Sequence, residues 1–173
     1  HVGVEDGLHH QIDPARLGVE VDEQPAPGQR EGRLQGRTDI PLEEGAAADL
    51  AKLALPTPWD QANLWSSPLQ RAVQTAQLVT HQAPQTSPAL MEMNWGDWEG
   101  QKGVEMKADP TKDYRDIEDW GWNYTPPNGE KLSEFNLRIE NAVHSLLKNF
   151  RGQKIALFTH AGVIRTLVAW CLQ

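Results

Sequence analysis

The sequence predicts an α/β fold, a three-layer αβα sandwich around a mostly parallel central sheet. The first observation is composition: 173 residues with 39% hydrophobic and 23% charged side chains are typical of one globular domain with its own core. The second is a nearly continuous apolar run at 154–159 that stands between two helical patterns. Such a run is typical of a strand covered on both faces, as in a parallel sheet flanked by helices.

The chain begins with an atypical segment, residues 1–29, that we set apart from the domain at 30–173. It has no sustained period apart from a short apolar alternation that begins at Leu17, and a Pro- and Gly-rich stretch at 24–28 then interrupts regular structure. The chain starts with a histidine rather than a methionine and stops at Gln173 within a predicted helix. We therefore expect the fold to be incomplete at both ends.

Three elements are predicted in the first half of the domain. Good helix formers at 43–55 predict a helix that ends before Pro56. Residues 63–67 then predict a short strand. Ser67 followed by Pro68 predicts the N-cap and the first position of the next helix, because serine caps helix starts and proline fits the first turn.

The helix after Pro68 carries an arginine at a position that favours anions. Its buried stripe is predicted by apolar residues at three- and four-residue spacings, which are Leu69, Ala72, Val73, Ala76 and Val79. Arg71 lies near the N-terminus of this helix and off the stripe. A helix N-terminus has free N–H groups and partial positive charge, so this is a natural anion site.

The second half is predicted to contain a long loop region followed by helix, strand and helix. Residues 84–130 have no sustained period and hold four of the seven tryptophans, Trp95, Trp98, Trp120 and Trp122, which is typical of a functional loop region. The apolar positions between Leu132 and Phe150 then predict the clearest helix of the chain. The strand at 154–159 follows, and a last helix is predicted from Gly162.

Charge and composition exclude several classes of protein. The net charge is −8, from 16 basic and 24 acidic residues, and no cluster of Lys or Arg offers a face for nucleic acid. No apolar run approaches the roughly 18 residues of a membrane span, and the first residues do not resemble a signal peptide. Cys171 is the only cysteine, which excludes an internal disulfide and leaves too few thiolates for structural zinc. We therefore expect a cytoplasmic location and no nucleic acid or membrane partner.

Two predicted strand ends carry the residues with chemistry. One strand leads into Ser66–Ala76, which contains Arg71, and the other leads into Thr159–Arg165, which contains His160. Ligands of parallel sheets bind at the carboxyl ends of strands. A guanidinium, an imidazole and free backbone N–H groups that converge there form a receptor for a phosphate or carboxylate dianion.

Four blocks around these residues resemble the histidine phosphatase superfamily. They follow the family's order and spacing: Glu31–Leu42, Ser66–Ala76, Leu90–Glu92 with Gly96–Gly100, and His160–Arg165. The superfamily includes cofactor-dependent phosphoglycerate mutases, broad-specificity phosphatases and alpha-ribazole phosphatases. The motif Arg-Leu-Gln-Gly-Arg at 33–37 is closer to the phosphatase branches than to the mutases. The resemblance implies a phosphoglycerate mutase-like fold and a phosphomonoesterase that works through a phosphohistidine intermediate, without a metal or other cofactor.

The resemblance also implies roles for individual residues. Arg71 would hold the transferred phosphoryl group, and His160 would be the second histidine of the pocket, where it stabilises charge on that group. Glu92 would be the general acid, with Asp97 and Glu99 as nearby alternatives. A carboxylic acid that donates a proton near neutral pH needs a raised pKa, and neighbouring tryptophans would supply the apolar setting. Gln35 aligns with a position that lines the substrate pocket.

The chain departs from the family at the nucleophile. The family has Arg-His-Gly at the end of its first strand, but Asp22, Glu23 and Gln24 stand at the aligned positions. Three hypotheses stay open: an active phosphatase whose start is lost or misread, a pseudoenzyme that binds phosphorylated ligands, and an interaction module that keeps only the fold. Phosphoglycerate mutase-type transfer is a further alternative. We expect a small phosphorylated metabolite as partner, and self-association through an exposed sheet edge.

Overall fold

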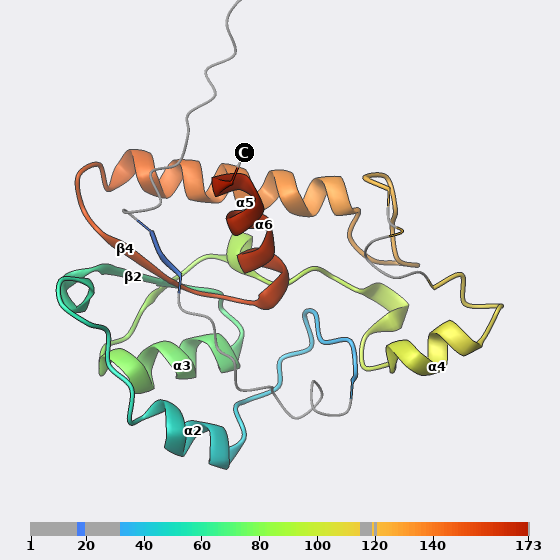
Figure 1. Ribbon diagram of the computed structural model, residues 1–173, viewed down its shortest axis with the longest axis horizontal. Helices are drawn as coiled ribbons and strands as arrows, with labels where there is room; N and C mark the ends of the chain where they lie inside the picture. The colour runs from blue at the N-terminus through green and yellow to red at the C-terminus, as the bar shows by residue number, and fades with distance from the viewer. Residues whose placement is uncertain (1–16, 20–31, 115–118, 120, 173) are drawn as a thin grey trace, which may run out of the picture.

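The protein is built on a parallel sheet of four strands in the order β1-β4-β2-β3. The computed structural model (Figure 1) describes residues 17–19, 32–114, 119 and 121–172. Every pairing between neighbouring strands is parallel. The strands are β1 (Leu17–Val19), β2 (Asn63–Ser66), β3 (Gln85–Thr86) and β4 (Ile155–Phe158). The predicted strands at 63–67 and 154–159 are therefore confirmed as β2 and β4.

Helices cover both faces of this sheet. The helices of the described residues are α2 (Glu44–Leu50), α3 (Gln70–Thr80), α4 (Gly103–Ala108), α5 (Leu132–Asn149) and α6 (Ala161–Cys171), and α4 lies beside the sheet. Figure 1 shows α2 and α3 on one side of the sheet and α5 and α6 on the other, which confirms the predicted three-layer sandwich. Within the described part of the chain, no helix is both long and apolar enough to cross a membrane.

Strand β4 lies at the centre of two hydrophobic cores. All four of its residues are buried, and successive side chains of a strand point to opposite faces. Ile155 and Leu157 pack into one core with residues of α5 and α6, among them Ile139, Val143 and Leu167. Ala156 and Phe158 pack into the other core with residues of α2, α3 and β2, among them Leu50, Leu64 and Val79. Because β4 is buried on both faces, its residues are all apolar, which explains the continuous apolar run at 154–159.

The helix predicted at 43–55 is shorter than expected. Helix α2 ends at Leu50, and the N–H groups of Lys52 and Leu53 bond to carbonyls only three residues back. Leu53 is 48% exposed, so a further helical turn would bury little apolar surface. The approaching Pro56 also disfavours helical backbone before it.

Two other boundaries differ from the prediction. Ser67 is not the N-cap of α3: the helix begins at Gln70 after Leu69, and the Ser67 hydroxyl accepts a hydrogen bond from the Leu69 N–H (3.2 Å) in the turn before it. The segment 84–130, expected to be irregular, contains β3, α4 and two short 3₁₀ turns.

The sheet brings the two chemically marked strand ends together. Strands β2 and β4 are hydrogen-bonded neighbours, with Ser66 paired to Phe158 at their carboxyl ends. The N–H of Ser67 bonds to the Phe158 carbonyl (3.0 Å), one step further along. The chain then turns from β2 towards α3 and from β4 into α6, so Arg71 and His160 lie at the same edge of the sheet.

Candidate active site

Arg71 is a buried arginine tied to the loop at 36–38. Its side chain comes from the first turn of α3 and is only 8% exposed. The guanidinium donates to the Thr38 carbonyl (2.9 Å) and to the Gly36 carbonyl (2.7 Å). Among the described residues, these bonds occupy two of the five N–H groups of the guanidinium. The side chain is thereby fixed in direction and still has N–H groups for an anion.

The loop that orients Arg71 is itself held by Glu99. The Glu99 carboxylate accepts hydrogen bonds from the backbone N–H groups of Gly36 (3.1 Å), Arg37 (2.8 Å) and Thr38 (3.4 Å) and from the Thr38 hydroxyl (2.8 Å). Burial opposes ionisation of this carboxyl, but these bonds outweigh it and hold the pKa of Glu99 below its usual range. Glu99 therefore binds the N–H groups of a loop whose carbonyls bind Arg71.

Glu92 is a buried carboxyl aimed at the start of α6. It is 7% exposed and lies between two short 3₁₀ turns. One carboxylate oxygen, Oε1, accepts from the Met93 N–H (2.8 Å), and the other, Oε2, accepts from the Gly162 N–H (2.8 Å). Burial raises the pKa of Glu92, although the two N–H groups, Arg71 and Arg138 oppose this shift. A carboxyl group with a raised pKa holds its proton closer to neutral pH, as a proton donor must.

His160 lies at the point where β4 turns into α6. It is the N-cap residue of α6 and is 8% exposed. Burial, together with the charges of Arg71 and Arg138, lowers the pKa of His160 to about 3, so the imidazole is neutral at physiological pH. Its Nε2 atom is buried and has no hydrogen-bond partner among the residues that the structure describes. A buried polar atom without a partner is costly, and a ligand there would remove that cost.

Arg71, Glu92 and His160 therefore form one site. The charge of Arg71 acts on both Glu92 and His160, and Glu92 bonds to the backbone two residues after His160. The structure supplies a cationic donor, a neutral imidazole and a carboxyl with raised pKa at one edge of the sheet. This set can bind a phosphate dianion and give a proton to a leaving oxygen.

Gln35 lies directly before Gly36, whose carbonyl binds Arg71. Neither polar atom of its side chain has a partner within the described residues, and both are buried. Its backbone is thus adjacent to the site, and its amide group is available to a ligand. The role of Gln35 in a substrate pocket stays a prediction.

The alternatives to Glu92 as proton donor have other surroundings. Glu99 has a lowered pKa and is occupied by the loop at 36–38. Asp97 accepts two hydrogen bonds from the exposed Asn128 amide (3.0 and 3.1 Å). Trp98, expected to help make the setting of Glu92 apolar, has its ring against Tyr114 (5.1 Å between centroids) and Tyr124 (5.8 Å). Its burial and its raised pKa together favour Glu92 as the proton donor.

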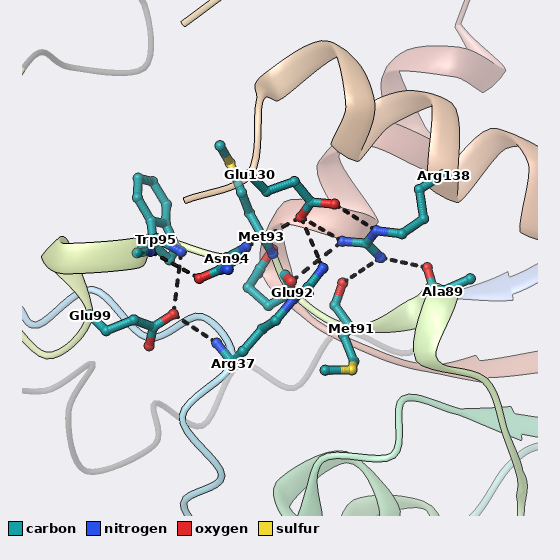
Figure 2. Close-up of polar contacts among 11 residues, drawn as sticks. Arg37, Ala89, Met91, Glu92, Met93, Asn94, Trp95, Glu99, Glu130 and Arg138 are labelled. Carbon is teal, nitrogen blue, oxygen red and sulfur yellow. Dashed lines mark hydrogen bonds and ion pairs between the residues drawn. The ribbon is translucent and has the colours of Figure 1, made fainter. Parts of the chain in front are cut away.

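Sequence reasoning missed the residues that support Glu92. Figure 2 shows the Arg138 guanidinium between the Glu130 carboxylate and the backbone around Glu92. The backbone N–H groups after His160 were expected to be free for an anion, and this is wrong for Gly162: its N–H, in the first turn of α6, donates to Glu92. The positions aligned with the family's nucleophile, Asp22, Glu23 and Gln24, lie outside the described residues.

The sequence and the fold both have known relatives. The chain matches the model of the histidine phosphatase superfamily (branch 1) over residues 25–173. It is 32% identical over 145 residues to the adenosylcobalamin/alpha-ribazole phosphatase of Salmonella typhimurium, a match that covers 80% of this chain and 70% of that protein. It is 35% identical over 107 residues to the Escherichia coli protein of the same name, covering 60% of this chain and 52% of that protein.

Among solved structures, the fold matches the crystal structure of phosphoglycerate mutase from Thermus thermophilus. The TM-score is 0.68 at 33% sequence identity, and the match covers 84% of this chain and 78% of that chain. The match to the E. coli phosphatase spans about half the length of that relative. The expectation of a phosphoglycerate mutase-like fold is confirmed.

Proposed function

Because the chain belongs to the histidine phosphatase superfamily, we propose that it is a phosphomonoester hydrolase by lineage, with a phosphoryl-binding site made by Arg71, His160 and Glu92. Its ligand is a small phosphorylated metabolite. Two relatives are named alpha-ribazole phosphatases, which favours hydrolysis over the mutase alternative.

The observation that carries this proposal is the unused bonding capacity of the site. Arg71 is buried and uses only part of its guanidinium towards the described residues. His160 Nε2 is buried and unpartnered within the same residues. The remaining N–H groups of Arg71 and the unpartnered Nε2 of His160 meet at the carboxyl edge of a parallel sheet, and this supports a bound anion because binding would use both.

Each residue has a separate task in hydrolysis. Arg71 holds the equatorial phosphoryl oxygens by charge-assisted bonds, and neutral His160 donates one N–H to the same group. Glu92 in its protonated form gives its proton to the ester oxygen as the bond from phosphorus to that oxygen breaks. In the family's reaction the phosphoryl group passes to a histidine nitrogen, and water then releases it as phosphate.

The nucleophilic histidine of that reaction is missing from the chain. Glu23 stands at its aligned position, between Asp22 and Gln24. Without covalent capture the two-step route is closed, so we propose that the chain with these residues binds phosphorylated ligands and does not turn them over.

Binding is tested with inorganic phosphate and vanadate by isothermal titration calorimetry. We expect millimolar affinity for the unmodified protein and a loss of about 10- to 100-fold in Arg71→Ala, since each charge-assisted bond contributes about 1.5–3 kcal/mol. Arg151→Ala is the matched control, because Arg151 is an exposed arginine beyond the end of α5. Equal affinities of the Arg71→Ala variant and the unmodified protein would exclude the proposed pocket.

Turnover is tested with an activated aryl phosphate. We expect no hydrolysis above background by the unmodified chain. Hydrolysis that disappears in His160→Ala would instead support the hypothesis of an active phosphatase. Absence of both binding and turnover would leave the fold-only interaction module.

A further inference from the structure

The segment that carries Glu92 has almost no regular structure of its own. We call residues 89–94 the acid strap; only its first two residues belong to a 3₁₀ turn. Buried backbone carbonyls need hydrogen-bond donors, and a strap of this kind must find them outside itself. The position of the Glu92 carboxyl depends on where these carbonyls are held.

Arg138, on α5, supplies most of the donors. Its NH1 group donates to the carbonyls of Ala89 (2.7 Å) and Met91 (3.0 Å), and its NH2 group makes a longer contact to the Glu92 carbonyl (3.5 Å). Nε and NH2 also donate to the two oxygens of Glu130 (2.8 and 2.9 Å). These contacts occupy all five N–H groups of the guanidinium, as Figure 2 shows.

Glu130 joins the same network at the far end of the strap. Its carboxylate accepts from the Asn94 N–H (3.3 Å), and its own N–H donates to the Asn94 carbonyl (2.8 Å). The Thr159 hydroxyl, next to His160, donates to the Leu90 carbonyl (2.7 Å). Arg138 therefore fixes the beginning and the middle of the acid strap to α5, and Thr159 fixes Leu90 to the end of β4. Glu130, just before α5, fixes the other end at Asn94.

We propose that Arg138 is the positioning residue of Glu92: its guanidinium, paired with Glu130, holds the acid strap so that the Glu92 carboxyl reaches the Gly162 N–H. This inference rests on the proposed role of Glu92. Arg138 is not a ligand-binding residue, because all its N–H donors are already used. Arg71, in contrast, has N–H donors that make no hydrogen bond to the described residues. The two arginines thus serve the same site in different ways.

Electrostatics agrees with this geometry. The charge of Arg138 opposes the upward shift of the Glu92 pKa and contributes to the lowered pKa of His160. Glu130, which faces Arg138, has a lowered pKa: burial opposes ionisation, but the hydrogen bonds and charge of Arg138, the Asn94 N–H and the charge of Arg37 together outweigh it. Glu130 also forms an ion pair with Arg37 (3.3 Å), so Arg37, Glu130 and Arg138 form one charged cluster beside the acid strap.

The experiment follows the Gly162 amide by NMR in the ligand-free protein. In the unmodified chain its proton chemical shift should move as Glu92 titrates, and Glu92→Gln gives the reference spectrum without that titration. We compare Arg138→Lys, which has three donors in place of five, with Arg151→Lys as the matched exposed control. Hydrogen exchange of Gly162 is measured against that of Ala76, a fully buried residue of α3.

We expect Arg138→Lys to lose the pH-dependent shift of Gly162 and at least 10-fold of its exchange protection relative to Ala76. A purely structural role would lower the protection of both amides together. If Arg138→Lys does not fold, Glu130→Gln, which keeps the side-chain shape, is measured in the same way. A Gly162 amide that still titrates and keeps its relative protection in the folded variant overturns the inference. The NMR comparison contains no phosphate, so it tests the role of Arg138 independently of phosphate binding. A failed phosphate titration would exclude the proposed function, and the Gly162 comparison would still decide whether Arg138 positions Glu92.

Discussion

Gly162 is a position where one added methyl group should displace the carboxyl of the proposed acid, Glu92. A Cβ at this residue would lie 2.3 Å from Glu92 Oε1 and 3.0 Å from Glu92 Cδ. To reach even a tight contact of 3.0 Å, Oε1 would have to retreat by about 0.7 Å. Because the carboxylate is buried and its other oxygen is bonded to the Gly162 N–H (2.8 Å), this retreat breaks or strains that bond.

The expected cost of Gly162→Ala follows from two opposing effects. Loss of a hydrogen bond to a charged group costs about 1.5–3 kcal/mol of unfolding free energy. Alanine in place of glycine within a helix returns about 0.5–1 kcal/mol. We expect a net destabilisation of about 1–2 kcal/mol, measured by urea unfolding followed by circular dichroism.

Gly45→Ala is the matched control. Gly45 is an exposed residue in α2, and a Cβ there meets no atom of the described structure within 4 Å. This variant should gain about 0.5–1 kcal/mol from helix propensity alone. If Gly162→Ala stabilises the protein as much as Gly45→Ala does, the Glu92 carboxyl does not occupy the space above Gly162, and its assignment to the site is wrong.

Three further predictions concern His160, the loop that holds Arg71, and the missing nucleophile. Below about pH 6.5 the unfolded state binds a proton at His160, whereas the folded state, in which the pKa of His160 is about 3, does not. The free energy of unfolding should therefore fall by up to about 5 kcal/mol from pH 6.5 to 3. In urea unfolding at several pH values, the free energy of unfolding of His160→Gln should depend less steeply on pH. Glu99→Gln should weaken phosphate binding about 2- to 10-fold in calorimetry, because an amide nitrogen would face the N–H donors of the loop that holds Arg71; unchanged affinity would show that this loop does not orient Arg71. Replacing residues 1–29 with a strand ending in Arg-His-Gly and a Thr-x-Trp-Asn loop should produce aryl phosphatase activity, which Glu92→Gln should slow by about 10²- to 10⁴-fold; a folded, phosphate-binding but inactive replacement would favour the pseudoenzyme.

The elements that the sequence predicted well are those with a local cause. The apolar run of β4 reflects burial on both faces, and the periodicity of α5 (Leu132–Asn149) reflects one buried stripe. Arg71 and His160 were placed at one sheet edge because parallel strands end on the same side. Each of these features depends on residues close together in the chain or on a general rule of topology.

The support of Glu92 had no such local cause. Glu130 lies just before α5 and Arg138 lies eight residues later within it, whereas the spacing that marks a charge pair on a helix is three or four residues. The other acceptors of Arg138 are the carbonyls of Ala89, Met91 and Glu92, which are 49, 47 and 46 residues away. Backbone atoms leave no side-chain pattern in a sequence, so this contact is visible only in three dimensions.

The polar and charged residues of the site separate into two kinds by the bonds they already make. Glu99 and Arg138 are saturated, since each has several hydrogen bonds to backbone groups of a loop. Arg71 and His160 keep polar atoms without partners among the described residues. A dianion can gain binding energy only from the second kind, whereas the first kind keeps the loops ordered before the ligand arrives. The polar atoms left without partners among the described residues therefore distinguish ligand-binding residues from positioning residues, although both kinds are buried or half-buried side chains around the same site.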